Sequence, residues 1–491
     1  MQAAQPVHRS WLMMALGPRL GRRAGQRLSF FHVLRHRSVD HKLPPSLQSE
    51  QDPFQRLLVF PSSRFSAREG DSLYEKTTLA NGLRILTATM PHTYSVAVAI
   101  YVGAGSRYER KEQAGLSHFV EHLCFKGSQK RPTSKDISEA IDRVGGVLNG
   151  GTDRELTVYY SKVAAPHFPL ALDVLVDMVR APRLDPEEME KERRVILEEL
   201  AMTADTPSQL VDLLIDEALW ADQPLGWDVA GTEESVKTID RQMALDYLSR
   251  QYVTNNIVIT VAGNVEHRQV EEQVAAFWGD SPPGSPSPWY PATDGHGPRC
   301  ALRYKKSEQA HLCLAVRGIP LQHPDRHALA VLSVILGEGM SSRLFLELRE
   351  RQGLVYDVHS YVSHFLDTGA FTVYAGVDPA KTVDALKVIL GELVHLRDGV
   401  DEEELAKAKE LSKGRLMLRL EDTRSVAGWM GGQELLLGEV RTPDHVVQLL
   451  DAVTVEDVQR VARDLLVDDQ LHMALVGPFR SDRRFAPLLK L

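Results

Sequence analysis

Several features are scarce in this 491-residue sequence, and each scarcity excludes a class of protein. It has only three cysteines, Cys124, Cys300 and Cys313, and this odd number at wide spacing argues against a disulfide framework and for a reducing compartment. No apolar run is long enough to cross a bilayer, so we expect no transmembrane segment. Positive charge is not in excess: the formal net charge is −9, which gives no sign of nucleic-acid binding.

Acidic residues are absent from the first 39 positions, which hold seven arginines. Such a composition is typical of a mitochondrial transit peptide. The alternatives are an unstructured leader or an upstream start site carried along with the gene. We interpret residues 1–71 as a basic leader without a fold of its own.

The chain is longer than one ordinary core allows, so two or more domains are expected. Residues 281–299 are rich in proline, serine and glycine and form the clearest linker, which separates residues 72–280 from residues 300–491. The strands expected from the pattern are residues 83–87, 95–102, 149–163, 312–317 and 370–377, and the helices are residues 118–122, 134–144, 168–179, 186–202, 327–336 and 343–350. Because the order of elements repeats after the linker, the sequence predicts an α+β protein of two similar tandem halves.

The segment HFVEH places His118, Glu121 and His122 at i, i+3 and i+4 of a predicted helix, so all three project from one face. Two imidazoles one turn apart can hold a divalent metal such as zinc, and an adjacent glutamate can act as a general base on water. The order is the inverse of the commoner HExxH arrangement. Coincidence is the alternative, and a third ligand is needed to decide.

A second helix is predicted to begin near Asp185, with proline in its first turn and carboxylates near its positive end. Glu192 and Glu199 are seven residues apart on this helix, nearly two full turns, and therefore share a face. Taken alone, glutamates on a charged helix usually form a solvated surface. The helix therefore offers a third ligand without assigning one.

Several motifs together resemble the M16 (pitrilysin/insulinase-like) zinc peptidases, the family that includes the mitochondrial processing peptidases. HFVEH is followed after 76 residues by Glu199 of VILEEL. The other matching segments are GGVLNGGTDRELTVYY at residues 145–160, QPLG at 223–226, SSRLF at 341–345 and the stretch from Arg349 to Tyr356. The resemblance covers almost everything from residue 72 onward. It implies a duplicated LuxS/metallohydrolase-like fold of the processing-peptidase type, with halves that close like a clamshell.

The resemblance implies a role for each residue of the predicted metal site. One Zn²⁺ per chain would be held by His118, His122 and Glu199, with a position left open for water. Glu121 would take the proton from that water and pass it to the leaving amine. Glu192 would orient a metal-binding histidine.

The resemblance also implies how substrate is bound. Asn149 matches an asparagine near the scissile bond, and the strand from Gly150 onward matches an edge to which an extended peptide adds as a further strand. Arg349 and Tyr356 match a pair that reaches from the other half to the substrate carbonyl and the developing oxyanion. The second half has no HxxEH, so only the first half is expected to carry out the chemistry.

The sequence departs from the processing peptidase in one informative place. That enzyme recognises arginine with acidic residues 10 and 14 positions after its zinc glutamate, where this chain has Gln209 and Leu213, although Asp212 and Asp216 are nearby. The turn at residues 336–341 is also short, in place of the glycine-rich loop of the noncatalytic partner subunit. Both departures favour a bacterial, cytoplasmic homologue. The alternative is the mitochondrial matrix, if the leader is a transit peptide.

Three hypotheses follow for function. The first is a zinc metalloendopeptidase that cuts extended or unfolded peptides. The second is a processing peptidase subunit of the β type, and the third is a structural or assembly subunit of the same family. In each case we expect a homodimer or a heterodimer with another M16 chain.

Overall fold

The computed structural model describes residues 74–295 and 297–491, which fold around two β-sheets. The leader predicted for residues 1–71 lies outside the described residues. We call residues 74–280 the first half and residues 300–491 the second half. No helix in the described part of the chain has an apolar stretch that could span a bilayer.

The first sheet has the strand order β1-β2-β6-β3-β5-β4. Its strands are β1 (Glu75–Thr78), β2 (Arg84–Thr89), β3 (Ser95–Val102), β4 (Val147–Thr152), β5 (Thr157–Ala164) and β6 (Ile257–Gly263). β2 and β6 run parallel, and the other neighbours pair antiparallel. The interior strand β3 reads SVAVAIYV and is buried from Val96 to Val102, as expected for a strand covered on both faces. β4 forms one end of this sheet.

Most helices of the first half lie on one face of this sheet, where their apolar residues join those of β2, β3 and β6 in one core. They are α1 (Leu116–Cys124), α2 (Ser134–Asp142), α3 (Phe168–Arg180), α4 (Pro186–Asp205), α6 (Glu233–Thr238), α7 (Arg241–Gln251) and α8 (His267–Trp278). The remaining α-helix described for this half, α5 (Pro207–Trp220), packs elsewhere. The start of α4 follows the prediction: the Asp185 side chain accepts hydrogen bonds from the Glu187 and Glu188 amides, and Pro186 is the first helical residue.

The second sheet has the order β7-β11-β8-β10-β9, with β11 parallel to β7 and the other pairs antiparallel. Its strands are β7 (Cys300–Tyr304), β8 (Ala310–Gly318), β9 (Val355–His364), β10 (Gly369–Val377) and β11 (His472–Gly477). Its helices are α9 (Arg326–Gly337), a π-helix (Phe345–Arg351), α10 (Thr382–Asp398), α11 (Glu402–Arg419), α12 (Thr423–Leu437), α13 (Pro443–Asp451) and α14 (Val455–Leu465). The fold class is therefore as predicted, α+β with two tandem halves.

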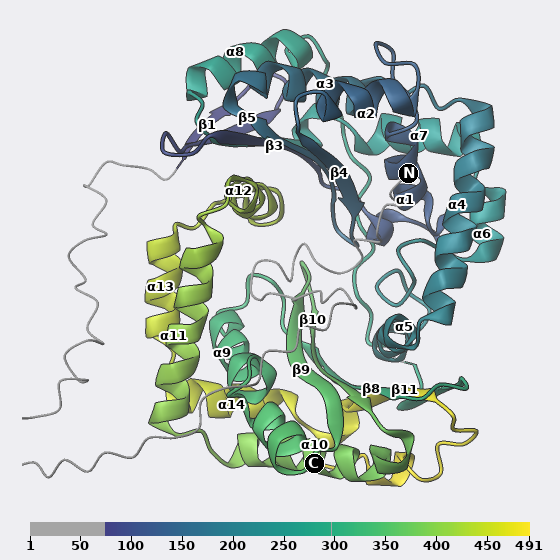
Figure 1. Ribbon diagram of the computed structural model, residues 1–491, viewed down its shortest axis with the longest axis vertical. Helices are drawn as coiled ribbons and strands as arrows, with labels where there is room; N and C mark the ends of the chain where they lie inside the picture. The colour runs from purple at the N-terminus through teal and green to yellow at the C-terminus, as the bar shows by residue number, and fades with distance from the viewer. Residues whose placement is uncertain (1–73, 296) are drawn as a thin grey trace, which may run out of the picture. The chain divides into compact units, whose positions relative to one another are not determined.

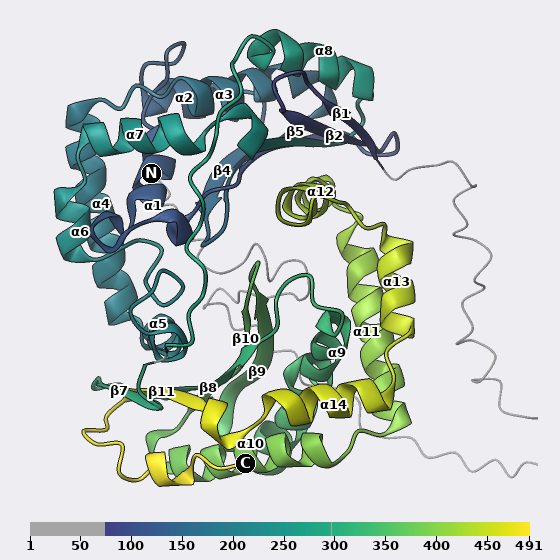
Figure 2. The same cartoon turned by 180° about the vertical axis from the view of Figure 1, so that it is seen from behind.

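The two halves exchange a helix. α5 of the first half lies on the second sheet, where Ile215, Leu219 and Trp220 share a core with Cys313 and Ala315 of β8. α12 of the second half lies on the first sheet, in the core formed by alternate residues of β3 and β6. Figure 1 and Figure 2 show α5 beside β8 and β11, and α12 beneath the strands of the first sheet. Each sheet therefore has one face covered by its own half and the other by a helix of the opposite half.

Two local predictions differ from the structure. Residues 149–163, predicted as one strand, belong to the hairpin β4–β5, whose strands are joined by a turn at residues 153–156. The predicted helix at residues 343–350 overlaps the π-helix, whose wider turns place side chains at different angles from those of an α-helix. The five helices between residues 382 and 465 had not been predicted.

Candidate metal centre and active site

Helix α1 carries the HFVEH segment and divides its side chains between two environments. Phe119, Val120 and Leu123 enter the core of the first half. His118 and His122 lie one turn apart on the face that meets α4. The predicted helical placement of the two imidazoles is therefore what the structure has.

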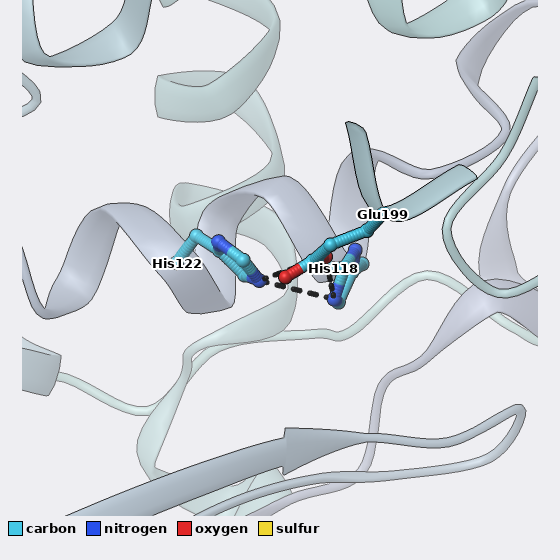
Figure 3. A group of neighbouring side chains, drawn as sticks. All are labelled: His118, His122 and Glu199. Atoms are coloured by element: carbon cyan, nitrogen blue, oxygen red, sulfur yellow. Dashed lines mark hydrogen bonds and ion pairs between the residues drawn. The ribbon is translucent and has the colours of Figure 1, made fainter. Parts of the chain in front are cut away.

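Glu199 comes from α4 and points at the two imidazoles (Figure 3). The Nε2 atoms of His118 and His122 are 3.1 Å apart. The Glu199 Oε2 atom lies 3.9 Å from the first of these and 3.8 Å from the second. Within the described residues, these three are the group of histidine, cysteine and acidic side chains whose ligand atoms converge, all within 4.8 Å of one another.

Glu192 lies behind His122, one step away from this group. The His122 Nδ1–H donates to Glu192 Oε2 at 3.1 Å, and the Lys126 ammonium contacts the other carboxylate oxygen at 2.6 Å. Burial acts to raise the pKa of Glu192, but the bonds from His122 and Lys126 outweigh it and hold this pKa below its usual value. An ionised Glu192 fixes the His122 proton on Nδ1, which leaves the Nε2 lone pair directed at Glu199 and His118.

Glu121 is nearly fully buried beside these groups. Burial is the main cause that raises its pKa to about 7; the His122 ring acts in the opposite direction, and the Glu199 carboxylate adds to the rise. A carboxyl group with a pKa near neutrality can both accept and return a proton at physiological pH. This property is the one a general base that later acts as an acid requires.

Strand β4 runs past Glu121. A side chain at Gly150 would place its first carbon 2.9 Å from Glu121 Oε1 and 3.0 Å from the Phe125 ring, so it would displace the Glu121 carboxylate. The neighbouring Asn149 side chain accepts a hydrogen bond from the Gly150 amide at 2.8 Å. The structure thus brings Gly150 to the predicted general base, on a strand that ends the sheet.

Arg349 and Tyr356 lie in the second half. The Arg349 guanidinium is 5.1 Å from the centre of the Phe345 ring, within the π-helix. Tyr356, in β9, is 62% exposed. Their contact with a substrate at the metal centre stays a prediction.

Two acidic residues near the expected arginine-binding positions are already used inside the protein. Asp212 accepts a hydrogen bond from the Tyr361 hydroxyl at 3.1 Å, and Asp216 forms a 2.6 Å ion pair with Arg154. Both carboxylates are buried, and Tyr361 belongs to the second half. They therefore do not take the place of the two acidic residues of the processing peptidase, at whose positions this chain has Gln209 and Leu213.

Sequence reasoning missed two residues that support the site. Lys126 lies four residues beyond His122, a spacing that places both near Glu192 and could have indicated the contact. Glu109 binds the start of α1 from outside the helix, and its distance in sequence from HFVEH gives no periodic signal.

Comparison with known proteins gives the family. The family description "Insulinase (Peptidase family M16)" matches residues 84–233, and "Peptidase M16 inactive domain" matches residues 238–412. The chain belongs to peptidase family M16. The M16 assignment agrees with HFVEH in the first half and its absence from the second.

M16 relatives from bacteria cover most of the chain. A protein of Bacillus subtilis named an uncharacterized zinc protease is 37% identical over 407 residues, which cover 83% of this chain and 98% of that protein. One of the same description from Streptomyces coelicolor is 38% identical over 434 residues, covering 87% and 94%. These names support a zinc peptidase.

Solved M16-like structures share the fold. A protease from Helicobacter pylori superimposes with a TM-score of 0.77 at 24% identity, covering 82% of this chain and 99% of that one. A chain of complex III2 from Candida albicans gives a TM-score of 0.73 at 22% identity, covering 85% and 100%. At these identities the likeness concerns the fold alone.

Proposed function

We propose that this M16 chain is a zinc-dependent endopeptidase that hydrolyses extended or unfolded peptides. The observation that carries the proposal is the convergence of His118, His122 and Glu199 beside a buried carboxyl group, Glu121. Zinc binds such ligands at about 2.0–2.2 Å in a tetrahedral arrangement, so its ligand atoms lie roughly 3.4 Å apart. Separations of 3.1, 3.8 and 3.9 Å between the three side chains fit this requirement.

The side chains of this site divide the chemistry among them. Zinc, when bound, supplies a Lewis acid that favours attack of water on a peptide carbonyl. Glu121 accepts the proton of the attacking water and returns it to the amine that leaves. Glu192 keeps the His122 proton on Nδ1, so that Nε2 remains a ligand.

The terminal strand β4 gives the substrate its place. A peptide that adds to β4 as a further strand runs along the edge that carries Asn149 and Gly150, and Gly150 lies against Glu121. Main-chain pairing of this kind needs an extended substrate, which favours unfolded peptides over folded proteins. Arg349 and Tyr356 would contact the substrate carbonyl from the second half.

Two alternatives are less well supported. A processing peptidase subunit needs acidic residues for arginine, but Gln209 and Leu213 are not acidic, and Asp212 and Asp216 are bonded elsewhere. An assembly subunit has no need of a converging ligand set.

We propose that the protein acts as a dimer in the bacterial cytoplasm. Size-exclusion chromatography with activity measured across the peak tests the dimer. N-terminal sequencing of the native protein tests the compartment.

The proposal is tested by Glu121→Gln. The amide is close in size but cannot accept a proton, so we expect one zinc per chain to remain and hydrolysis of an unfolded protein to fall by about 10²- to 10⁴-fold. Zinc is measured by elemental analysis and cleavage by mass spectrometry. Glu198→Gln, at an exposed position beside Glu199 on α4, is the matched control and should cleave as the wild type does. Wild-type cleavage by Glu121→Gln would remove Glu121 from the mechanism.

A further inference from the structure

Glu109 holds the start of the metal-binding helix α1 from outside that helix. Its carboxylate accepts hydrogen bonds from the Gly115 amide at 2.8 Å, from the Ser117 amide at 2.6 Å and from the Ser117 hydroxyl. The first amides of a helix have no partner within it, so an acceptor there fixes the helix start. Burial raises the pKa of Glu109 to about 8, and the hydrogen bonds from Ser117 and Gly115 act in the opposite direction, so Glu109 holds the helix start as a hydrogen-bond acceptor. Ser117 directly precedes His118.

The opposite side of this helix start is also fixed. Gly115 has a left-handed backbone with φ of 92°, and a side chain there would come within 2.5 Å of the Ala230 carbonyl oxygen. The Ser235 hydroxyl donates to the Ala114 carbonyl oxygen at 2.7 Å. Glu109 on one side and residues 230–235 on the other therefore fix the position of the start of α1.

Arg107, two residues before Glu109, is fully buried and connects to the second half. Its guanidinium forms a 2.5 Å ion pair with Glu155 and a second ion pair with Asp367, which lies in the turn between β9 and β10. Its Nε–H donates to the Tyr290 carbonyl oxygen at 3.0 Å, and it lies 4.3 Å from the centre of the Trp289 ring. The linker and the second half thus meet at one buried arginine of the first half.

The two carboxylates are held in turn by the backbone around them. Glu155 Oε1 accepts from the Leu366 amide at 2.9 Å, and the second Asp367 oxygen accepts from the Ala292 amide at 2.8 Å. These bonds restrict the charged groups, because moving Arg107 away from them would leave a fully buried charge without a partner.

We propose that Glu109 is a positioning residue for the metal centre, and that Arg107 makes the position of α1 depend on the contact between Asp367 and the first half. The inference rests on the proposed function, since it assumes that His118 and His122 bind metal. It adds that the second half acts on the metal site through residues 107–117, in addition to any contact it makes with substrate.

The test measures metal binding instead of catalysis. Zn²⁺ affinity is determined by competition with a chromophoric chelator, and the visible spectrum of Co²⁺-loaded protein reports the geometry of the ligands. For Glu109→Gln we expect affinity to fall by about 10-fold, the lower end of what loss of a supporting residue costs, together with a changed cobalt spectrum. Asp367→Asn should also lower the Zn²⁺ affinity and change the cobalt spectrum, but by a smaller amount than Glu109→Gln.

Glu434→Gln is the control, because Glu434 is as buried as Glu109 but forms an ion pair with Lys76 and lies on α12 away from α1. It should lose stability and keep wild-type affinity and spectrum. A folded Glu109→Gln protein with wild-type affinity overturns the proposal. If that variant does not fold, Ser117→Ala takes its place, and wild-type affinity and spectrum in Ser117→Ala overturn it.

The remaining outcomes separate the two parts of the inference and the proposed function. Wild-type values in Asp367→Asn alone overturn the connection to the second half. A wild-type protein that binds no Zn²⁺ in the same titration overturns the proposed function instead.

Discussion

At the scale of single residues, the two carboxylate oxygens of Glu192 have different partners. One oxygen accepts a hydrogen bond from the His122 Nδ1–H, and the other forms an ion pair with the Lys126 ammonium, so both oxygens of the carboxylate have a partner. Lys126 keeps Glu192 ionised, and Glu192 keeps one nitrogen of His122 available to the proposed metal. A lysine that touches no ligand therefore supports the site through two intermediates.

Glu192→Gln should lower zinc affinity by about 10- to 100-fold, since the amide no longer stabilises the His122 Nδ1–H with a full charge. Affinity is measured by chelator competition at neutral pH. Glu187→Gln, an exposed position in the first turn of the same helix, serves as the control and should bind as the wild type does. Equal affinities for all three proteins would mean that Glu192 has only a structural role.

At the scale of elements, the fit between α12 and the first sheet depends on one glycine. Gly431 lies against Tyr101 of β3, and a side chain at this position would place its first carbon 2.2 Å from the Tyr101 ring. Tyr101 is 2% exposed, so its ring has no space into which to move. Gly432, the next residue of the helix, has no neighbouring atom within 4 Å of such a carbon.

This pair gives a matched test of the exchanged helix. Gly431→Ala should lower the free energy of unfolding by about 1–3 kcal/mol through overpacking. Gly432→Ala should be neutral or raise it by up to about 1 kcal/mol, because alanine favours helix over glycine. Both are measured as shifts of the thermal midpoint by calorimetry. A Gly431→Ala protein at least as stable as Gly432→Ala would contradict the tight contact.

The elements also show where sequence reasoning succeeds and fails. The start of α4 was predictable because Asp185 and Pro186 act on adjacent residues. The position of α5 was not, since Trp220 packs against strands of the second half, β8 and β11, and nothing local distinguishes that sheet from the sheet of its own half. Asp212 and Asp216 are a similar case: the sequence shows only that they lie near Gln209 and Leu213, because their partners Tyr361 and Arg154 lie far away in sequence.

At the scale of the whole molecule, stability should depend on pH through buried histidines of the second half. Burial is the main cause that lowers the pKa of His327 and of His364 to about 4, and for His327 the charges of Arg326 and Arg441 add to it. Neither ring nitrogen of His327 has a hydrogen-bond partner in the described part of the chain. Both histidines are therefore neutral in the folded protein at neutral pH.

Because the folded pKa lies below the unfolded value of about 6.5, only the unfolded chain takes up these protons as pH falls toward 4. The contribution of each neutral histidine to the free energy of unfolding is therefore fully present above pH 6.5. It decreases below that pH, by on the order of 2 kcal/mol per histidine at pH 5. His327→Leu should reduce the drop in thermal midpoint between pH 7 and pH 5. His92→Leu, at an exposed position, should leave the drop as it is. An unchanged drop in His327→Leu would contradict the assignment.

The exchange of α5 and α12 decides how this gene can be divided. A product that ends at the linker would expose the alanines and Tyr101 of β3 to water, and would carry α5 with no sheet to cover. Neither this product nor one that begins at the linker would have a complete hydrophobic core. A single backbone cut in the linker of the folded protein has the opposite result, because each piece then keeps a helix buried in the other and the nicked chain stays one particle.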